Sequence, residues 1–318
     1  MRWLVDPRNE FQLVSAITLL DGGMGRELNR MGAPFRQPEW SALALLEAPQ
    51  FVTRAHESYV AVGADVITTN TYAVVPFHIG ADRFKAQGRA LAELAGRLAR
   101  GVADRASRPV IVAGSLPPPC GSYRAEWFDV AVARPIVKTL IDALEPWVDI
   151  WLAETLSRIA EAELVRELIG PASDPRVKAL WLSFTVEDAA GTSGPARLRS
   201  GEPVADAAAA ALRLGAGALL FNCSQPEVMG AAVEEARHVL QTAGPTAANV
   251  RIGVYANAFP PVNAEVAEAN VGLSAIRADL TPAAYRAWAE DWAARGASII
   301  GGCCGIGPEH IAALRADP

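Results

Sequence analysis

The chain has 318 residues, of which 51% are hydrophobic, and it carries a formal net charge of −6 at pH 7. This length and hydrophobic content suit a single large domain with a sizeable core, whereas the acidic balance argues against nucleic acid, which requires a basic surface. Because no apolar run approaches the roughly 20 residues that span a bilayer and no secretory signal is recognisable, we expect a cytoplasmic protein without membrane partners.

Short apolar runs recur along the chain, each followed by polar or glycine-containing residues and then by a helix-like stretch. The runs are continuously hydrophobic rather than alternating, which is typical of parallel strands that are buried on both faces. In chain order, the predicted strands are 17–22, 64–70, 110–115, 149–154, 179–185, 218–223, 251–257 and 298–303.

Amphipathic segments that separate these runs are predicted to be helices. Three of them contain residues that cap or open a helix, namely Ser157, Asp206 and Thr281 followed by proline. The predicted helices are 49–62, 84–106, 125–147, 156–169, 203–214, 226–242 and 281–295.

The regular alternation of strand and helix over eight units predicts a (β/α)₈ barrel that forms one domain over residues 1–318. An open, doubly wound parallel sheet is the alternative. No linker or shift in composition interrupts the chain. The stretch 259–276 is long for a connection between a strand and a helix, so it is a candidate lid or substrate loop. The sequence does not indicate an oligomeric state.

Chemically distinctive residues stand at the predicted strand ends. Barrel enzymes place their chemistry on the loops that follow the strands, so these residues are expected to converge. They are Asp21, Asn70, Ser115, Glu154, Cys223 and the pair Cys303–Cys304.

Three of the four cysteines form a candidate metal site. Cys303 and Cys304 lie between glycines, and adjacent cysteines rarely form a disulfide with each other because the small ring strains the bond. Together with Cys223 they offer three thiolates and an open position, as in a zinc site that accepts a substrate. Small buried hydrophobes and a redox pair are the alternatives. Cys120, in a proline-rich loop, is expected to be inert.

Two acidic residues are candidate ligand contacts. Glu154 ends an apolar run, where a carboxylate is costly unless it is paired or binds a ligand. Asp21 precedes two glycines, so a turn residue or helix cap is equally consistent with its position.

Several segments resemble the homocysteine S-methyltransferases, and they occur in family order over nearly the whole chain. The segments begin with Leu20-Asp21-Gly22-Gly23-Met24-Gly25 and the run from Gly63 to Tyr72. Gly114-Ser115-Leu116-Pro117, Ala153-Glu154-Thr155, Asn222-Cys223 and the specific motif Gly301-Gly302-Cys303-Cys304-Gly305 follow. Leu220 stands where the family usually has Gly, and Ile306 where it usually has Thr.

This resemblance implies a barrel fold, a zinc ion held by Cys223, Cys303 and Cys304, and homocysteine as the methyl acceptor. It also implies that Asp21 and Glu154 hold the amino group of homocysteine. A zinc-bound thiolate attacks a methyl group on a cationic donor with little acid–base help, so no histidine base is needed. Aromatic faces stabilise such cations, and Trp40, Tyr72 and Phe259 are available for this role.

We expect the donor to be a sulfonium, S-methylmethionine or S-adenosylmethionine, because a neutral thioether leaves more readily than a tertiary amine. The chain ends eight residues after His310 and so resembles the compact S-methylmethionine-dependent enzymes rather than the longer betaine-dependent ones. A betaine donor, another thiol or selenol acceptor, and an inactive zinc- or thiol-binding sensor are the alternatives.

Overall fold

The structure is a computed structural model that describes residues 17–188, 194–244, 249–260 and 275–315. Within these ranges, no helix is long and apolar enough to cross a membrane. The central part of the predicted lid, 261–274, lies outside the described residues.

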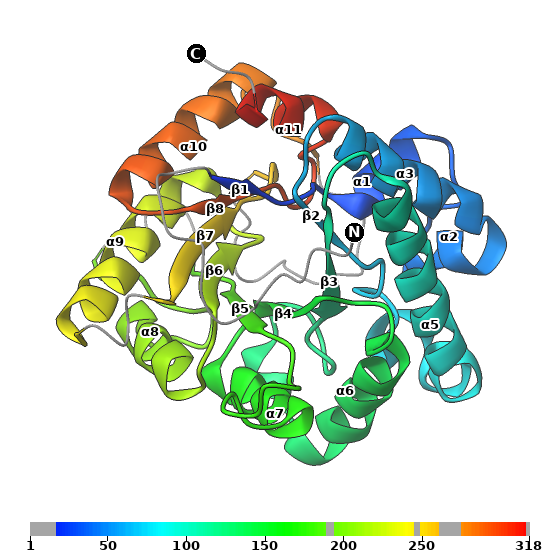
Figure 1. Cartoon of the computed structure of the whole chain (residues 1–318), viewed down its shortest axis with the longest axis horizontal. Coiled ribbons are helices and arrows are strands. Elements are labelled where there is room, and N and C mark those ends of the chain that lie inside the picture. The colour runs from blue at the N-terminus through cyan, green and yellow to red at the C-terminus, as the bar shows by residue number, and fades with distance from the viewer. Residues whose placement is uncertain (1–16, 189–193, 245–248, 261–274, 316–318) are drawn as a thin grey trace.

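Eight parallel strands form the centre of the fold, with helices around them (Figure 1). The sheet order β1-β8-β7-β6-β5-β4-β3-β2 places the first and second strands at its two margins. A parallel bridge between Leu20 and Val66 joins these margins, and Asp65 N donates to Leu19 O at 2.7 Å. This closure distinguishes a barrel from an open sheet, so the predicted (β/α)₈ architecture is confirmed.

The strands fall inside the predicted apolar runs or within two residues of them. They are β1 (Thr18–Leu19), β2 (Val66–Thr68), β3 (Ile111–Leu116), β4 (Ile150–Leu156), β5 (Leu180–Phe184), β6 (Ala218–Asn222), β7 (Arg251–Tyr255) and β8 (Ile299–Ile300).

The helices lie outside the strands and pack against their neighbours along the chain. They are α1 (Met24–Arg30), α2 (Ala42–Glu47), α3 (Pro49–Ala61), α4 (Pro76–Ile79), α5 (Ala81–Arg105), the 3₁₀ helix η1 (Ala125–Trp127), α6 (Val130–Leu144), α7 (Ile159–Ile169), α8 (Val204–Arg213), α9 (Pro226–Thr242), α10 (Pro282–Arg295) and α11 (Pro308–Arg315).

Local capping explains where the predicted helices were right and wrong. Thr281 caps α10 as predicted, because its hydroxyl accepts from Ala284 N at 3.2 Å. The continuous helix predicted over 125–147 is wrong, since Asp129 accepts from the backbone of Ala131 at 2.7 Å and starts α6 after η1. Ser157 and Asp206 are not caps: α7 starts after Arg158, and Asp206 lies within the first turn of α8.

The apolar core has two layers, one inside the barrel and one between the barrel and its helices. Side chains from alternate strand positions, such as Leu152, Trp181 and Leu220, fill the interior. Leu220 lies beside Gly253 of the next strand, where a Cβ would approach Leu220 Cδ2 to 2.8 Å. The departure from the usual glycine at position 220 is therefore accommodated by a missing side chain on β7.

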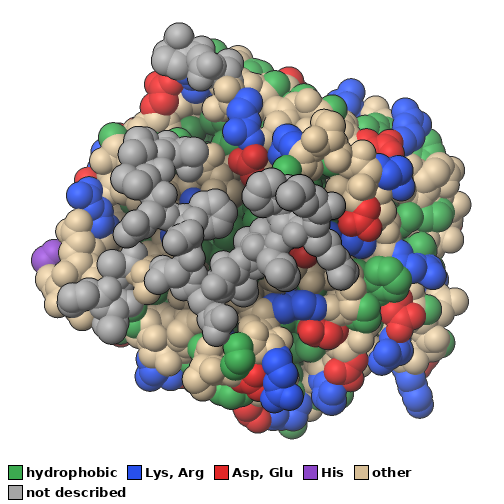
Figure 2. Space-filling view, in the orientation of Figure 1, with side chains coloured by type: hydrophobic (Ala, Val, Ile, Leu, Met, Phe, Trp, Pro, Cys, Tyr) green, Lys and Arg blue, Asp and Glu red, His purple; other side chains and the backbone are tan. Residues whose placement is uncertain are grey.

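Charged residues of both signs are interspersed around the margin of the face shown in Figure 2. Ion pairs on the helices include Arg134 with Glu167 at 2.6 Å and Lys138 with Asp142 at 2.8 Å. Such exposed pairs contribute little to stability. The positions of the buried polar groups at the strand ends are therefore more informative about function.

Candidate metal and substrate site

The predicted site residues follow the carboxyl ends of the barrel strands. Asp21 and Asn70 come directly after β1 and β2, and Ser115 and Glu154 lie near the ends of β3 and β4. Cys223 follows β6, and the pair Cys303–Cys304 follows β8. Parallel strands end at the same mouth of a barrel, which is where barrel enzymes carry their chemistry.

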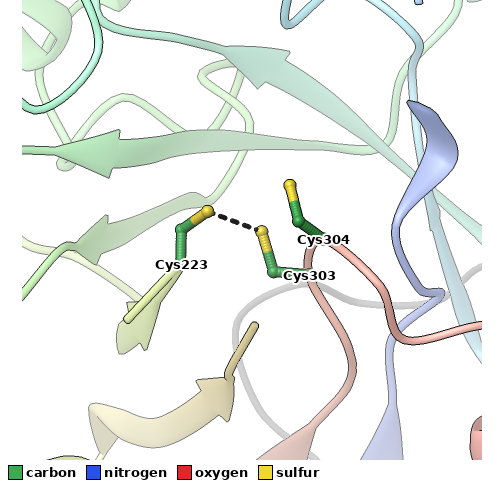
Figure 3. Close-up of side chains that lie close together, drawn as sticks. All are labelled: Cys223, Cys303 and Cys304. Carbon is green, nitrogen blue, oxygen red and sulfur yellow. Dashed lines mark hydrogen bonds between the residues drawn. The ribbon is translucent and has the colours of Figure 1, made fainter. Parts of the chain in front are cut away.

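The sulfur atoms of Cys223, Cys303 and Cys304 form a single cluster. All three Sγ atoms lie within 4.8 Å of one another, and the Cys303 thiol donates to Cys223 Sγ at 3.0 Å. Figure 3 shows the three side chains approaching from two loops, with their sulfurs close together. The predicted convergence of residues 80 positions apart is therefore confirmed.

Tight backbone packing explains the glycines that flank the cysteine pair. A Cβ on Gly302 would collide with the Ile306 side chain, and Gly305 has φ +85°, which L side chains rarely adopt. Ile306, the second departure from the family pattern, is itself buried against this turn. These glycines let the loop fold back on itself so that both thiols reach the cluster.

This donor set fits a metal ion of the zinc type. Tetrahedral ligands about 2.3 Å from zinc lie about 3.8 Å apart, a spacing that the three thiols satisfy with small adjustments. Hydrogen bonding to Cys223 and Cys303 lowers the pKa of Cys304, whereas hydrogen bonding to Cys223 raises the pKa of Cys303. The cluster thus favours one thiolate, and a bound cation would favour deprotonation of the other two thiols.

Asp21 is buried and spans two strands. Its Oδ2 accepts from Thr68 N at 2.7 Å and its Oδ1 from Thr68 Oγ1 at 3.1 Å. Burial outweighs these hydrogen bonds and, with the nearby charge of Glu154, raises the pKa of Asp21 to about 7. The alternative of a simple helix cap is not supported, because α1 starts after Gly23 without a side-chain cap.

Glu154 is buried in the same region. Its carboxylate accepts from Ser115 Oγ and from the Tyr255 hydroxyl, the latter at 3.2 Å. Burial raises the pKa of Glu154 to about 7. Among the described residues, neither Glu154 nor Asp21 forms a salt bridge. Two neighbouring buried carboxylates without a protein cation form a site suited to a cationic ligand.

Strained backbone is concentrated at this end of the barrel. In the described ranges, the non-glycine residues with positive φ are Trp40, Tyr123, Thr155 and Cys223, with φ between 48° and 64°. Such conformations cost about 1–3 kcal/mol each and persist where the surroundings impose them. Two of them directly follow Glu154 and Asn222, so the strain sets the directions of Glu154 and the Cys223 thiol.

Asn222 fixes both strained positions. Its Oδ1 accepts from Thr155 N at 3.0 Å and from Ser183 Oγ at 2.7 Å, and its Nδ2 donates to Thr155 Oγ1 at 2.8 Å. These buried bonds connect the end of β6 to the end of β4 across β5. Asn222 therefore couples the position of Glu154 to that of Cys223.

The other predicted contacts occupy the same mouth with different partners. Asn70 Nδ2 donates to Ser41 O at 3.0 Å, while its buried Oδ1 has no partner within the described structure. The Tyr72 hydroxyl bonds Ser122 Oγ at 2.7 Å. Trp40 packs edge-on against Phe35 with ring centroids 5.7 Å apart. Cys120 does not join the thiol cluster, and its Sγ lies 3.9 Å from Asp129 O.

Sequence reasoning missed four residues that hold the site together. Thr68 and Tyr255 orient the two carboxylates, Asn222 connects their strands, and the Tyr123 hydroxyl lies 2.8 Å from Cys223 Sγ. Asn222 and Thr68 fall within the quoted motifs, which was a usable signal. Tyr123 and Tyr255 lie outside every quoted motif.

Comparisons with known proteins agree with this geometry. The family described as homocysteine S-methyltransferase matches residues 18–317. A homocysteine S-methyltransferase from Escherichia coli is 32% identical, with 94% of each chain covered, and a selenocysteine Se-methyltransferase from Brassica oleracea is 27% identical, with 93% of this chain and 87% of the relative covered.

A solved structure gives the same result. The metallated form of the homocysteine methyltransferase MmuM from Escherichia coli superposes with a TM-score of 0.70 at 29% identity, and the match covers 94% of this chain and 95% of the other. The family match and the structural match thus each cover nearly the whole chain, and the family match includes the cysteine cluster. The chain belongs to the homocysteine S-methyltransferase family and is a methyltransferase.

Proposed function

We propose that this protein transfers a methyl group from a sulfonium donor to the thiolate of L-homocysteine and forms methionine. The observation that carries the proposal is the three-thiol cluster of Cys223, Cys303 and Cys304 close to two buried carboxylates that lack a protein cation. A thiol-binding metal and an ammonium-binding pair together match the two ends of one aminothiol acceptor.

The three cysteines would hold a zinc ion. When bound, zinc supplies the Lewis acidity that keeps the acceptor sulfur as a thiolate at neutral pH. Thiolate ligands favour zinc over harder cations such as magnesium. The similarity to a metallated relative supports a metal at this position.

Asp21 and Glu154 would bind the acceptor's ammonium group. Their pKa values of about 7 show that burial makes the two negative charges unfavourable in the free protein. An ammonium group placed between them would relieve this cost and keep both carboxylates ionised. The unpartnered Oδ1 of Asn70 would supply a further acceptor, and Ser115 would keep Glu154 in place by donating to it.

The methyl transfer itself requires no proton movement. The acceptor sulfur's lone pair forms the new bond to the methyl carbon as the old bond between carbon and the sulfonium sulfur breaks. The bonding electrons stay on the departing sulfur, which leaves as a neutral thioether. The residues therefore need to align the partners rather than exchange protons, and the aromatic faces of Tyr72 and Trp40 suit the donor's positive charge. Phe259 is less suited to this role, because the Arg26 guanidinium already lies over its ring, 5.6 Å from the centroid.

A panel of donors and acceptors tests the proposal. With homocysteine, we expect methionine formation to be fastest from S-methylmethionine, slower from S-adenosylmethionine and slight from betaine. Equal or faster turnover with betaine at matched concentration would contradict the sulfonium assignment. Selenocysteine in place of homocysteine tests the acceptor, because faster methylation of the selenol would overturn the choice of homocysteine.

A further inference from the structure

Tyr123 contacts the metal-site sulfur that comes from β6. Its hydroxyl lies 2.8 Å from Cys223 Sγ, although 100 positions separate the two residues. Tyr123 belongs to the connection between β3 and η1, and its backbone is left-handed with φ +64°. A bulky residue in this conformation is strained, so the fold imposes the position of the phenol.

The Tyr123 ring also contacts a charged pair, Arg199 and Asp188. The Arg199 guanidinium lies over the ring, 4.9 Å from its centroid, and bonds Asp188 at 2.8 Å. Asp188 in turn accepts from the backbone N–H of Gln225 at 3.2 Å, two residues after Cys223. The ring, the guanidinium and the carboxylate thus connect the loops after β3, β5 and β6 around a single sulfur.

We infer that Tyr123 is a positioning residue that donates a hydrogen bond to the Cys223 thiolate in the metal-bound protein. The inference rests on the proposed metal site. A metal-coordinating cysteine has lost its proton, so Cys223 cannot be the donor across the 2.8 Å contact and the phenol must be. A phenol keeps its proton at neutral pH, because its ordinary pKa is about 10.

This hydrogen bond affects the metal as well as the cysteine. A lone pair engaged by a hydrogen bond is less available to the metal, and such outer contacts orient and tune metal ligands. Because Cys223 then donates less electron density, the metal would keep more positive charge and would bind the acceptor sulfur more strongly. Tyr123 therefore acts on the reaction through Cys223 and not by touching the substrate.

Cobalt(II) in place of zinc gives a spectroscopic readout of this bond. The change is Tyr123→Phe, which removes a single oxygen atom. The matched control is Tyr72→Phe, because the Tyr72 hydroxyl bonds Ser122 at 2.7 Å instead of a sulfur. We expect the thiolate-to-cobalt charge-transfer band to move to lower energy in Tyr123→Phe and to stay in place in Tyr72→Phe.

A second variant, Arg199→Met, removes the cation over the ring and should shift the band in the same direction by a smaller amount. An unshifted band in a folded, cobalt-loaded Tyr123→Phe protein would overturn the inference. Absence of any thiolate band in the wild-type protein would instead overturn the proposed metal site, so the two failures are distinguishable.

Discussion

Aspartates at both ends of the barrel accept hydrogen bonds from the backbone of a neighbouring strand. Asp65 and Asp149 precede β2 and β4 and accept backbone N–H groups from Leu19 at 2.9 Å and from Val112 at 2.8 Å. At the opposite end, Asp21 follows β1 and accepts from Thr68 N at 2.7 Å. Each carboxylate thus links two neighbouring strands.

The two ends differ in how the negative charge is balanced. Asp65 pairs with Arg108 at 3.4 Å and Arg315 at 2.5 Å, and Asp149 pairs with Arg100 at 2.5 Å. Asp21 has no such partner in the described structure, and burial raises its pKa to about 7. Asp65 and Asp149 at the amino-terminal end therefore have arginine partners, whereas Asp21 and Glu154 at the carboxyl-terminal end have no ion-pair partner among the described residues.

The largest expected effect comes from removing two of the clustered thiols at the carboxyl-terminal end of the barrel. The double change Cys303→Ser and Cys304→Ser should abolish bound metal and methyl transfer, because a single thiolate cannot hold the ion. Elemental analysis checks this, with Cys120→Ser as a control that should keep one metal per chain. Full metal content in the double variant would disprove the proposed ligand set.

Glu154→Gln separates acceptor binding from metal binding. Losing a charged hydrogen bond typically costs about 1.5–3 kcal/mol, so the KM for homocysteine should rise roughly tenfold or more. Metal content should stay normal. The control acceptor is 4-mercaptobutyrate, which lacks only the amino group, and its kinetics should be insensitive to the change. An unchanged KM for homocysteine would remove Glu154 from the acceptor site.

Acidification should weaken the same interaction in the unmodified protein. The carboxylates must be ionised to bind an ammonium group, and both have pKa values of about 7 when free. Because two carboxylates must lose their protons, the kcat/KM for homocysteine should rise as pH increases through about 7 and fall by up to about a hundredfold for each unit well below it. A profile that is flat between pH 5.5 and 7.5 would contradict these values.

Neutralising Glu154 should also stabilise the free protein. Its folded pKa of about 7 exceeds the ordinary 4.5, so folding takes up a proton between these values and stability falls as pH rises through this window. At pH 8 the metal-free Glu154→Gln protein should gain on the order of 1–2 kcal/mol in the free energy of unfolding. Denaturant titration measures this, and a lower stability than that of the wild type would refute the expectation.

The smallest effect on the protein is expected from a change at the amino-terminal end of the barrel. Asp149→Asn weakens a partly exposed pair with Arg100 and should cost no more than about 1 kcal/mol of stability. Neither the metal content nor the KM for homocysteine should change, because Asp149 lies at the opposite end of the barrel. A rise in KM comparable to that of Glu154→Gln would mean that the two ends are not independent.

The barrel and the thiol cluster could be predicted because each rests on a local signal. The apolar runs marked the strands, and the cysteine pair between glycines marked the thiol cluster. Contacts that orient the site depend on three-dimensional closure instead. Thr68 bonds Asp21, 47 residues away in the sequence, and Tyr123 contacts Cys223, 100 residues away, so no local sequence pattern predicts either contact. The break between η1 and α6 was missed because the pattern of apolar residues continues across the Asp129 cap.

The bonds from Asn222 to Thr155 have a consequence for how acceptors are told apart. They hold the Glu154 carboxylate and the Cys223 sulfur at a fixed separation, because the buried Asn222 side chain bonds the residue that follows Glu154 and Asn222 itself directly precedes Cys223. In the proposed binding mode, an acceptor would span that separation with its ammonium group at one end and its sulfur at the other. Such a site would select acceptors by chain length. We expect cysteine, one methylene shorter than homocysteine, to contact either the carboxylates or the metal, but not both at once.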